Sequence, residues 1–245
     1  MMIILEAKLK NSLTSNNLKI VALILMVIDH FVAVFMIHNS VLTFSLRMFG
    51  RIAAPVFCYF IAEGYHYTSD RKKYAIRLLI FAAISHVPYN ILFKYSFFEA
   101  TSIMWGLAIG FIALCVIKSD KYGLPVKVAT VILATILTYT ANWNFVSVYW
   151  ILIFGIYQGD FKKQMIGLAL VGAVFHLIPT YLNFGPSHTG LPHWYQIGIF
   201  LAIPVLALYN GKLGKKSKLL NRVFYISYPA HMLILFLARL ILVEG

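Results

Sequence analysis

The sequence predicts an all-α fold, a polytopic bundle of about nine transmembrane helices in one integral-membrane domain that covers residues 1–245. Hydrophobic residues make up 61% of the 245-residue chain and charged residues only 12%, whereas soluble domains carry about 25% charged residues. Several apolar runs also reach the roughly 20 residues that a helix needs to cross the hydrocarbon core of a bilayer. A chain so poor in charge needs lipid as part of its solvent.

The apolar runs follow one another along the chain, and each is expected to form one span. We place them at residues 18–38, 46–66, 74–94, 102–117, 126–141, 145–157, 164–182, 195–209 and 223–243. The fifth and sixth runs are short and are separated only by the turn Asn142-Trp143-Asn144, so they form either two tilted spans or a re-entrant pair. Residues 1–17 are expected to be a cytoplasmic segment, and residues 18–243 the transmembrane bundle.

The basic residues give the expected orientation of these spans. With the N-terminus in the cytoplasm, 17 of the 21 lysine and arginine residues fall in cytoplasmic segments, as the positive-inside rule requires. The other four are Arg47, Arg51, Lys94 and Arg239. This distribution predicts an N-in, C-out topology. It also explains the net charge of +13, so no nucleic-acid partner is expected.

Polar residues inside the apolar runs are the candidate functional residues. Ionisable groups within a bilayer are costly and commonly mark a functional site or a paired bundle interior. Arg47 and Arg51 are four residues apart and share one helix face. The polar residues in the runs are, in chain order, Asp29, His30, Arg47, Arg51, Glu63, His86, Asn90, His176, Tyr228 and His231.

Two interpretations of the first of these residues stay open. In one, Asp29 pairs with Arg47 or Arg51, which neutralises a buried charge and fixes two helices together. In the other, Asp29, His30 and Arg51 line a polar cavity in which a histidine moves a proton. Adjacent helical residues point about 100° apart, so Asp29 is expected to serve a histidine or arginine on another span rather than His30.

The histidines carry the expected chemistry. At least one of His30, His86 and His231 is expected to be catalytic or to bind substrate, and the last two are also candidate partners of Asp29. His188 and His193 lie five residues apart in an outer loop without a neighbouring cysteine or acidic residue, so no metal is expected.

Soluble-enzyme motifs and a disulfide are not expected. No serine nucleophile elbow, P-loop or dinucleotide-binding fingerprint occurs in the sequence. Cys58 and Cys115 both lie inside apolar runs without a Cys-x-x-Cys spacing. We expect both to be buried thiols that pack in the protein interior.

Six segments of the sequence resemble the TraX family. They read LKIVALILMVIDH (18–30), LRMFGRIAAPVF (46–57), IAEGY (61–65), SDRKKY (69–74), SHVPYN (85–90) and YISYPAH (225–231). Together they are highly specific, and the resemblance runs from about Asn17 to Leu242. The family commonly has glutamine at the position of His86, which weakens a catalytic role for this residue.

The resemblance implies an integral-membrane acyltransferase in a bacterial cytoplasmic membrane. TraX-like proteins are associated with N-acetylation of a conjugative pilin subunit, and they look like distant relatives of larger membrane acyltransferases. The implied co-substrate is cytoplasmic acetyl-CoA. The implied acceptor is an amine or hydroxyl group at or across the membrane, carried by a pilin-like peptide, a glycan or a lipid.

The resemblance also implies roles for the candidate residues. His30 or His231 would deprotonate the acceptor, and Asp29 would orient a histidine or arginine. Arg47 and Arg51 would hold donor phosphates or a developing oxyanion. The further candidates for binding donor or acceptor are Glu63, Arg71, Lys72, His86, Asn90 and Tyr228.

Two other function classes stay open from the sequence. Charged and histidine residues within broken spans also suit a proton-coupled transporter or flippase, although an odd span number and the lack of a visible repeat argue mildly against it. The second class is a membrane assembly factor without enzymatic activity.

Overall fold

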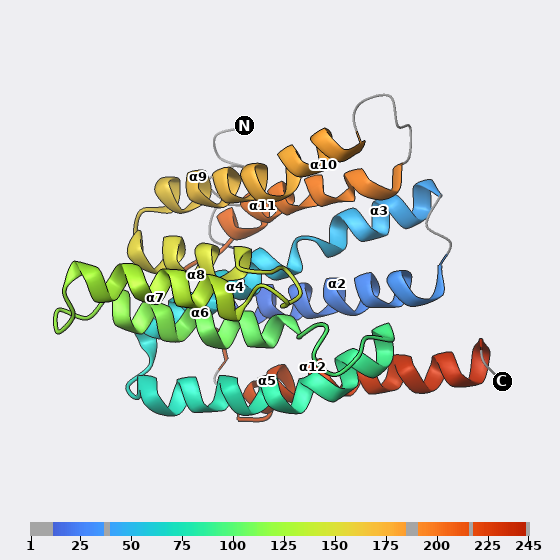
Figure 1. Ribbon diagram of the computed structural model, residues 1–245, viewed down its shortest axis with the longest axis horizontal. Helices are drawn as coiled ribbons and strands as arrows, with labels where there is room; N and C mark the ends of the chain where they lie inside the picture. The colour runs from blue at the N-terminus through green and yellow to red at the C-terminus, as the bar shows by residue number, and fades with distance from the viewer. Residues whose placement is uncertain (1–11, 37–39, 185–190, 216–217, 244–245) are drawn as a thin grey trace. The chain divides into compact units, whose positions relative to one another are not determined.

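The computed structural model describes residues 12–36, 40–184, 191–215 and 218–243, and Figure 1 shows their helices. The chain divides into two compact units. The first comprises residues 1–57 and 172–225, and the second comprises residues 58–171 and 226–245. Within the described residues no strand is present beyond two isolated bridges, Leu13 to Tyr209 and Thr101 to Ala141. The predicted all-α fold class is therefore confirmed, while the single membrane domain stays a prediction.

Every predicted apolar run is largely helical. The elements are α2 (Ser15–Phe35), α3 (Val41–Gly50), α4 (Ala53–Tyr67), α5 (Arg71–Phe93), α6 (Ile103–Ile117), α7 (Leu124–Leu137), α8 (Val146–Ile156), α9 (Phe161–Gly172), η1 (Ala173–Leu177), α10 (Ile178–Phe184), η2 (Leu191–Leu201), α11 (Ala202–Ala207) and α12 (Lys218–Leu242). Of these, η1 is a π-helical turn and η2 is a 3₁₀-helix.

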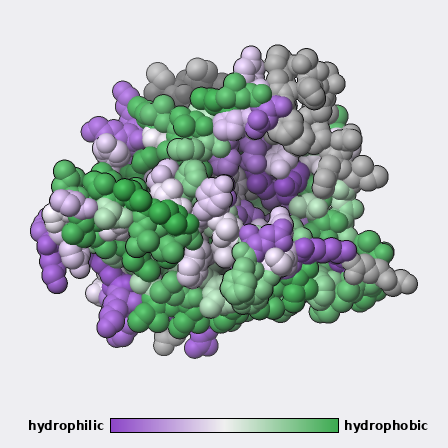
Figure 2. Space-filling view, viewed as in Figure 1, coloured by the Kyte–Doolittle hydropathy of each residue, from purple (hydrophilic) through white to green (hydrophobic). Residues whose placement is uncertain are grey.

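The described helices include five candidates for membrane spans. They are Ser15–Phe35, Val41–Tyr67, Arg71–Phe93, Phe161–Asn183 and Arg222–Leu242. Large apolar side chains lie exposed on the helices, such as Leu124 and Ile136 of α7, which are 75% and 66% exposed. Figure 2 shows apolar residues over much of the visible face. Apolar surface of this extent belongs against lipid, which identifies a membrane protein; the nine spans and their orientation stay predictions.

The predicted second span is broken between α3 and α4. The break follows from Pro55, because proline has no N–H to bond the carbonyl of Arg51 and its ring clashes with that carbonyl in a continuous helix. The N–H of Ile52 instead bonds the carbonyl of Phe49 at 3.2 Å. Pro55 then occupies the first turn of α4, where its missing N–H is not needed. The interruption covers only Arg51 and Ile52, and Val41–Tyr67 as a whole remains one candidate span.

Side-chain caps start several of the helices. The side chain of Ser40 accepts from the N–H of Thr43 at 3.0 Å, and that of Asp70 accepts from the N–H of Lys73 at 2.9 Å. Each bond satisfies one of the N–H groups that a helix start leaves without a partner. The same bond lowers the pKa of the Asp70 carboxyl, because it favours the charged form.

In the first unit, α3 packs against both α2 and η2. The chain entering α2 also pairs with the segment that follows α11. The N–H of Leu13 bonds the carbonyl of Leu208 at 2.9 Å, and the N–H of Ser15 bonds that of Lys212 at 2.9 Å. These carbonyls satisfy N–H groups at the start of α2, so the two distant segments hold each other in place.

In the second unit, α6 packs against α5, α7 and α8. Small residues allow the close approach of α8. A Cβ at Gly110 of α6 would lie 2.6 Å from Cδ1 of Ile151 in α8, closer than real Cβ atoms approach. Glycines four residues apart, such as Gly106 and Gly110, let helix backbones come together within membranes. Cys58 and Cys115 are free thiols, the first buried and the second half-buried.

Candidate functional site

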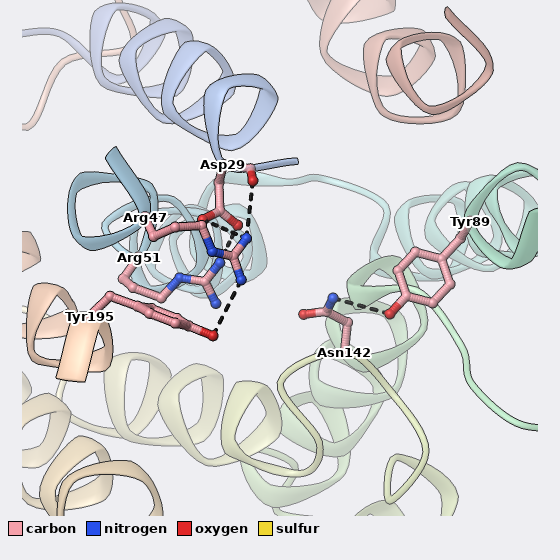
Figure 3. A network of polar contacts seen from close by, with 6 residues as sticks. All are labelled: Asp29, Arg47, Arg51, Tyr89, Asn142 and Tyr195. Atoms are coloured by element: carbon pink, nitrogen blue, oxygen red, sulfur yellow. Dashed lines mark hydrogen bonds and ion pairs between the residues drawn. The ribbon is translucent and has the colours of Figure 1, made fainter. Parts of the chain in front are cut away.

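In the first unit, Asp29 of α2 contacts Arg47 of α3 and Arg51, the residue that caps the end of α3 (Figure 3). Its Oδ1 lies 3.1 Å from Nη1 of Arg47, and its Oδ2 accepts a hydrogen bond from Nη2 of Arg51. Nη1 of Arg47 also donates to the backbone carbonyl of Asp29 at 3.0 Å. The four-residue spacing puts both guanidinium groups on one helix face. The predicted ion pair is present, with both arginines rather than one.

The three charged groups are largely removed from solvent. The side chains of Asp29 and Arg51 are 6% and 10% exposed, and that of Arg47 is 17% exposed. Burying a charge costs several kcal/mol unless other charges and hydrogen bonds compensate it. Mutual compensation explains how these groups persist within apolar helices, and the greater exposure of Arg47 makes it the accessible member of the set.

Gly50 brings α3 close enough for these contacts. A Cβ added at this position would lie 2.5 Å from Cβ of Asp29 and 2.6 Å from its Oδ1. Real Cβ atoms essentially never approach so closely, so any larger residue would displace Asp29 or α3. The glycine between the two arginines is therefore a positioning residue for the ion pair.

Tyr195 of η2 completes the group. Its hydroxyl accepts a hydrogen bond from Nη2 of Arg47 at 3.3 Å. The centroid of its ring lies 4.8 Å from Cζ of Arg47 and 5.3 Å from Cζ of Arg51, so the ring makes cation–π contacts with both. We call Asp29, Arg47, Arg51 and Tyr195 the arginine centre.

The sequence reasoning missed Tyr195. The residue opens an apolar run, where a tyrosine is expected as an anchor at the membrane interface. Its link to α3 depends on Gly198, since a Cβ there would overlap the carbonyl oxygen of Met48. Gly198 is the one local signal that could have indicated a close backbone approach.

His30 lies next to Asp29 in α2 and is buried, with 8% of its surface exposed. Its side chain points about 100° away from that of Asp29 around the helix. The expected polar cavity that includes His30 stays a prediction, as does its catalytic role.

In the second unit, His231 of α12 is buried and its imidazole is oriented by the helix backbone. Nδ1 lies 2.7 Å from the carbonyl oxygen of Ser227. A carbonyl oxygen can only accept, so Nδ1 carries the proton, and Nε2 of the neutral ring is the basic nitrogen. The ring of Tyr228 contacts the imidazole edge-on, with centroids 5.4 Å apart. His231 thus has the tautomer that a general base at Nε2 requires.

His86 and Asn90 both hold the loop that follows α5. Nε2 of His86 lies 2.8 Å from the carbonyl oxygen of Phe97, and Nδ2 of Asn90 lies 3.2 Å from the same oxygen. Both nitrogens donate, since the carbonyl can only accept. The two residues, four apart in α5, therefore anchor this loop together, while a substrate-binding role for either residue stays a prediction.

The remaining candidates lie near the junction of α4 and α5. Glu63 is buried in α4. Arg71 donates from Nε to the carbonyl of Tyr65 at 3.2 Å and lies over that ring, 4.1 Å from its centroid. Lys72 is exposed beside it. These contacts orient the Arg71 guanidinium at the start of α5, next to a second exposed cation.

A further polar contact in the second unit was not predicted. Nδ2 of Asn142, in the turn between α7 and α8, donates to the hydroxyl of Tyr89 in α5 at 3.2 Å (Figure 3). Asn142 reads as an ordinary turn residue, and Tyr89 as one aromatic among many, so no sequence signal links them.

Among the described residues, no group of three or more metal-ligating side chains occurs. His188 lies outside the described residues, as does the side chain of His193. His176 lies in the π-helical turn η1.

Comparison with known proteins gives one family and one curated relative. The family model described as TraX protein matches residues 14–239. A protein of Dichelobacter nodosus with the description "Probable fimbrial assembly protein FimC, serogroup H1" is 26% identical over 235 residues, which is 92% of this chain and 96% of that protein. No solved structure matches.

Proposed function

The chain belongs to the TraX family, and from this premise we propose that it is an integral-membrane acyltransferase. It moves an acetyl group from cytoplasmic acetyl-CoA to an amine or hydroxyl acceptor at or across the membrane. The thioester C–S bond of the donor breaks, and a C–N or C–O bond to the acceptor forms. The acceptor proton passes through a base to the leaving CoA thiolate, so the reaction needs no other reagent.

The observation that carries this proposal is the bond from His231 to the carbonyl of Ser227. It leaves Nε2 of His231 as the basic nitrogen, on a side chain that is buried. A base positioned in this way accelerates proton removal from an acceptor by about 10²–10⁴-fold. His30, the other buried candidate, is the alternative base.

The arginine centre supplies charge stabilisation in this proposal. Guanidinium groups held in a dry site stabilise a developing oxyanion or bind donor phosphates, since their positions need no reorganisation during the reaction. Asp29 serves as the positioning residue for both arginines. At the start of α5, Arg71 and Lys72 attract the phosphates of CoA.

The proposed topology has nine spans with the N-terminus in the bacterial cytoplasm and the C-terminus outside. In that arrangement the start of α5 faces the cytoplasmic pool of acetyl-CoA, which agrees with the role given to Arg71 and Lys72. Five of the spans have helices of sufficient length and hydropathy. The shorter apolar helices supply the other four.

The acceptor is proposed to be a component of a surface appendage. The description of the relative from Dichelobacter nodosus refers to fimbrial assembly, so a pilin-like peptide amine is the first acceptor to test. A glycan or a lipid headgroup provides the same nucleophilic amine or hydroxyl.

The test uses the purified full chain in lipid vesicles with acetyl-CoA labelled in the acetyl group. Labelled acceptor and free CoA thiol should appear in equal amounts when a pilin-like peptide is added. Activity should fall at least about 100-fold in His231→Ala if His231 is the base, or in His30→Ala if His30 is. If both variants keep full activity, the histidine mechanism is wrong.

His66→Gln is the matched control for these variants. Nε2 of His66 lies 3.3 Å from the carbonyl of Gly155, and the glutamine amide can keep this donor. The control should therefore retain activity, which separates loss of a base from loss of a hydrogen-bonded histidine elsewhere in the chain.

A proton-coupled transporter is the second candidate, and helices that contain an internal proline or a π-helical turn favour it. Pro88 and Pro229 lie inside α5 and α12, and the π-helical turn η1 interrupts the helix that α9 begins. Broken helices line substrate pathways in many carriers. Solute uptake driven by a proton gradient, without transfer of the acetyl label, would support this candidate over the acyltransferase.

A further inference from the structure

The arginine centre carries more positive than negative charge. Arg47 and Arg51 contribute two cations, and Asp29 contributes one anion. Within the described residues of the first unit, Asp29 is the single acidic residue. The three side chains that contact one another therefore sum to one positive charge. An excess charge in a largely apolar surrounding is costly, and an anion that binds there removes the cost.

The donor geometry of the centre suits an oxyanion. The ring of Tyr195 lies over both guanidinium groups, so a ligand must approach their edges, where the N–H groups point. The edge of a guanidinium group matches the two oxygens of a carboxylate or phosphate. The Tyr195 hydroxyl accepts from Arg47, and its own proton can be donated to a ligand beside that arginine.

Access to the centre lies on the side of Arg47, whose side chain is 17% exposed compared with 6% for Asp29.

Tyr195 belongs to η2, an 11-residue 3₁₀-helix. Such helices are uncommon beyond about 3–4 residues, because their hydrogen bonds are less favourable than those of an α-helix. Tyr195 therefore stands on an unusually long 3₁₀-helix.

We propose that the arginine centre is a binding site for a singly charged oxyanion, a carboxylate or a phosphodiester. One negative charge balances the site, whereas a dianion would leave an excess negative charge in the same apolar surrounding. Arg47 and Tyr195 contact the ligand, and Asp29 and Gly50 position the arginines. The proposed function gives the same arginines to a developing oxyanion or donor phosphates; the monoanion binding proposed here is measured with no acetyl-CoA present and does not require acyl transfer.

The test titrates the full chain in detergent with acetate, dimethyl phosphate or sulfate at constant ionic strength and follows thermal unfolding. Ligands that bind the folded state raise the unfolding midpoint with concentration. Acetate or dimethyl phosphate should do so in a saturable way, and the better of the two identifies the site as a carboxylate or a phosphodiester site. Sulfate should bind at least about tenfold more weakly. No saturable rise with either monoanion, or equal binding of sulfate, would overturn the proposal.

Variants assign the effect to the centre. Arg47→Gln removes the excess charge but leaves the pair of Asp29 and Arg51, and it should weaken monoanion binding by about tenfold or more. Arg77→Gln makes the same chemical change in the second unit and should bind like the wild type. Unchanged binding by Arg47→Gln contradicts the proposal, and unchanged binding by Tyr195→Phe removes Tyr195 from the site.

A second measurement keeps the proposal testable if Arg47→Gln does not fold. Phenylglyoxal modifies accessible arginines, and mass spectrometry of the wild-type chain reports the modification of Arg47 by itself. Saturating acetate or dimethyl phosphate should slow this modification several-fold while leaving that of Arg77 unchanged. Equal rates with and without the monoanions would contradict binding at Arg47.

Discussion

At the scale of single residues, Gly50 determines how closely α3 approaches Asp29. Gly50→Ala would place a Cβ 2.5 Å from Cβ of Asp29, so either the carboxylate or the helix must move. We expect a loss of about 1–3 kcal/mol in the free energy of unfolding, the usual cost of overpacking. Thermal unfolding of the purified variant in detergent measures this loss.

Gly123→Ala is the matched control for Gly50→Ala. The nearest atom to an added Cβ at Gly123 is Cδ of Pro125 at 3.7 Å, an ordinary contact. This substitution should cost only about 0.5–1 kcal/mol, the loss expected when alanine replaces glycine at an N-cap, and so less than Gly50→Ala. Equal destabilisation by both variants would show that Gly50 has no special role in the ion pair.

The residue scale also separates what the sequence could predict of the site from what it could not. The pair formed by Asp29 with Arg47 and Arg51 follows from helical spacing and from the cost of a buried charge. The addition of Tyr195 does not, because it depends on how η2 packs against α3 after some 140 intervening residues. Local spacing determines which side chains share a face, whereas packing between distant segments determines what that face meets.

At the scale of elements, Asp70 starts α5 as its N-cap. Asp70→Ala should lower the unfolding midpoint at neutral pH, because the N–H of Lys73 loses its acceptor. The pKa of Asp70 is lowered in the folded state. The ionised Asp70 carboxylate therefore stabilises the folded protein above the unfolded-state pKa of about 4, and this contribution is lost as pH falls through the lower folded-state pKa. The difference between the two proteins should disappear in that acidic range.

Asp70→Asn tests whether the charge or the hydrogen bond matters. Asparagine caps helices about as well as aspartate but does not titrate. The difference in midpoint between Asp70→Asn and Asp70→Ala should therefore persist at acidic pH. If the difference in unfolding midpoint between Asp70→Asn and Asp70→Ala also vanished at acidic pH, acid would be acting on groups other than Asp70.

Elements were predictable where hydropathy alone defines them. All nine apolar runs are largely helical, because the sequence of a helix within lipid is a long apolar run. The break between α3 and α4 was missed, although Pro55 stands one turn after Arg51 in the sequence. The hydropathy of the run is continuous across the break, so only the backbone chemistry of proline indicates it.

At the scale of the whole molecule, the lengths of α7 and α8 bear directly on the span count. They have 14 and 11 residues, or about 21 Å and 17 Å at 1.5 Å per residue. Both are shorter than the roughly 30 Å of a bilayer core. Two crossings by this pair need either a locally thinned bilayer or contributions from the turns at their ends. A re-entrant pair needs neither, yet it would leave seven spans, an odd number that keeps the C-terminus outside.

Because both arrangements place the two termini alike, only the turn between α7 and α8 distinguishes them. We expect the nine-span arrangement. The test places Tyr139→Cys in a chain without Cys58 and Cys115 and adds a membrane-impermeant maleimide outside intact cells. In the nine-span arrangement the cysteine at position 139 should be labelled. Tyr139 is 70% exposed, so a cysteine there can react. Phe98→Cys, 88% exposed before α6, should label from outside in either arrangement, and Asp120→Cys only after the cells are opened.

The three positions together test both topology and orientation. Labelling at Phe98 without labelling at Tyr139 would mean that α7 and α8 enter and leave on the cytoplasmic side. Labelling at Asp120 but not at Phe98 would mean that the N-in orientation is wrong. The second result would also place the start of α5 away from cytoplasmic acetyl-CoA, because Arg71 and Asp120 are on the same side in either arrangement. The donor-binding role proposed for Arg71 and Lys72 therefore depends on this topology, whereas anion binding at the arginine centre does not.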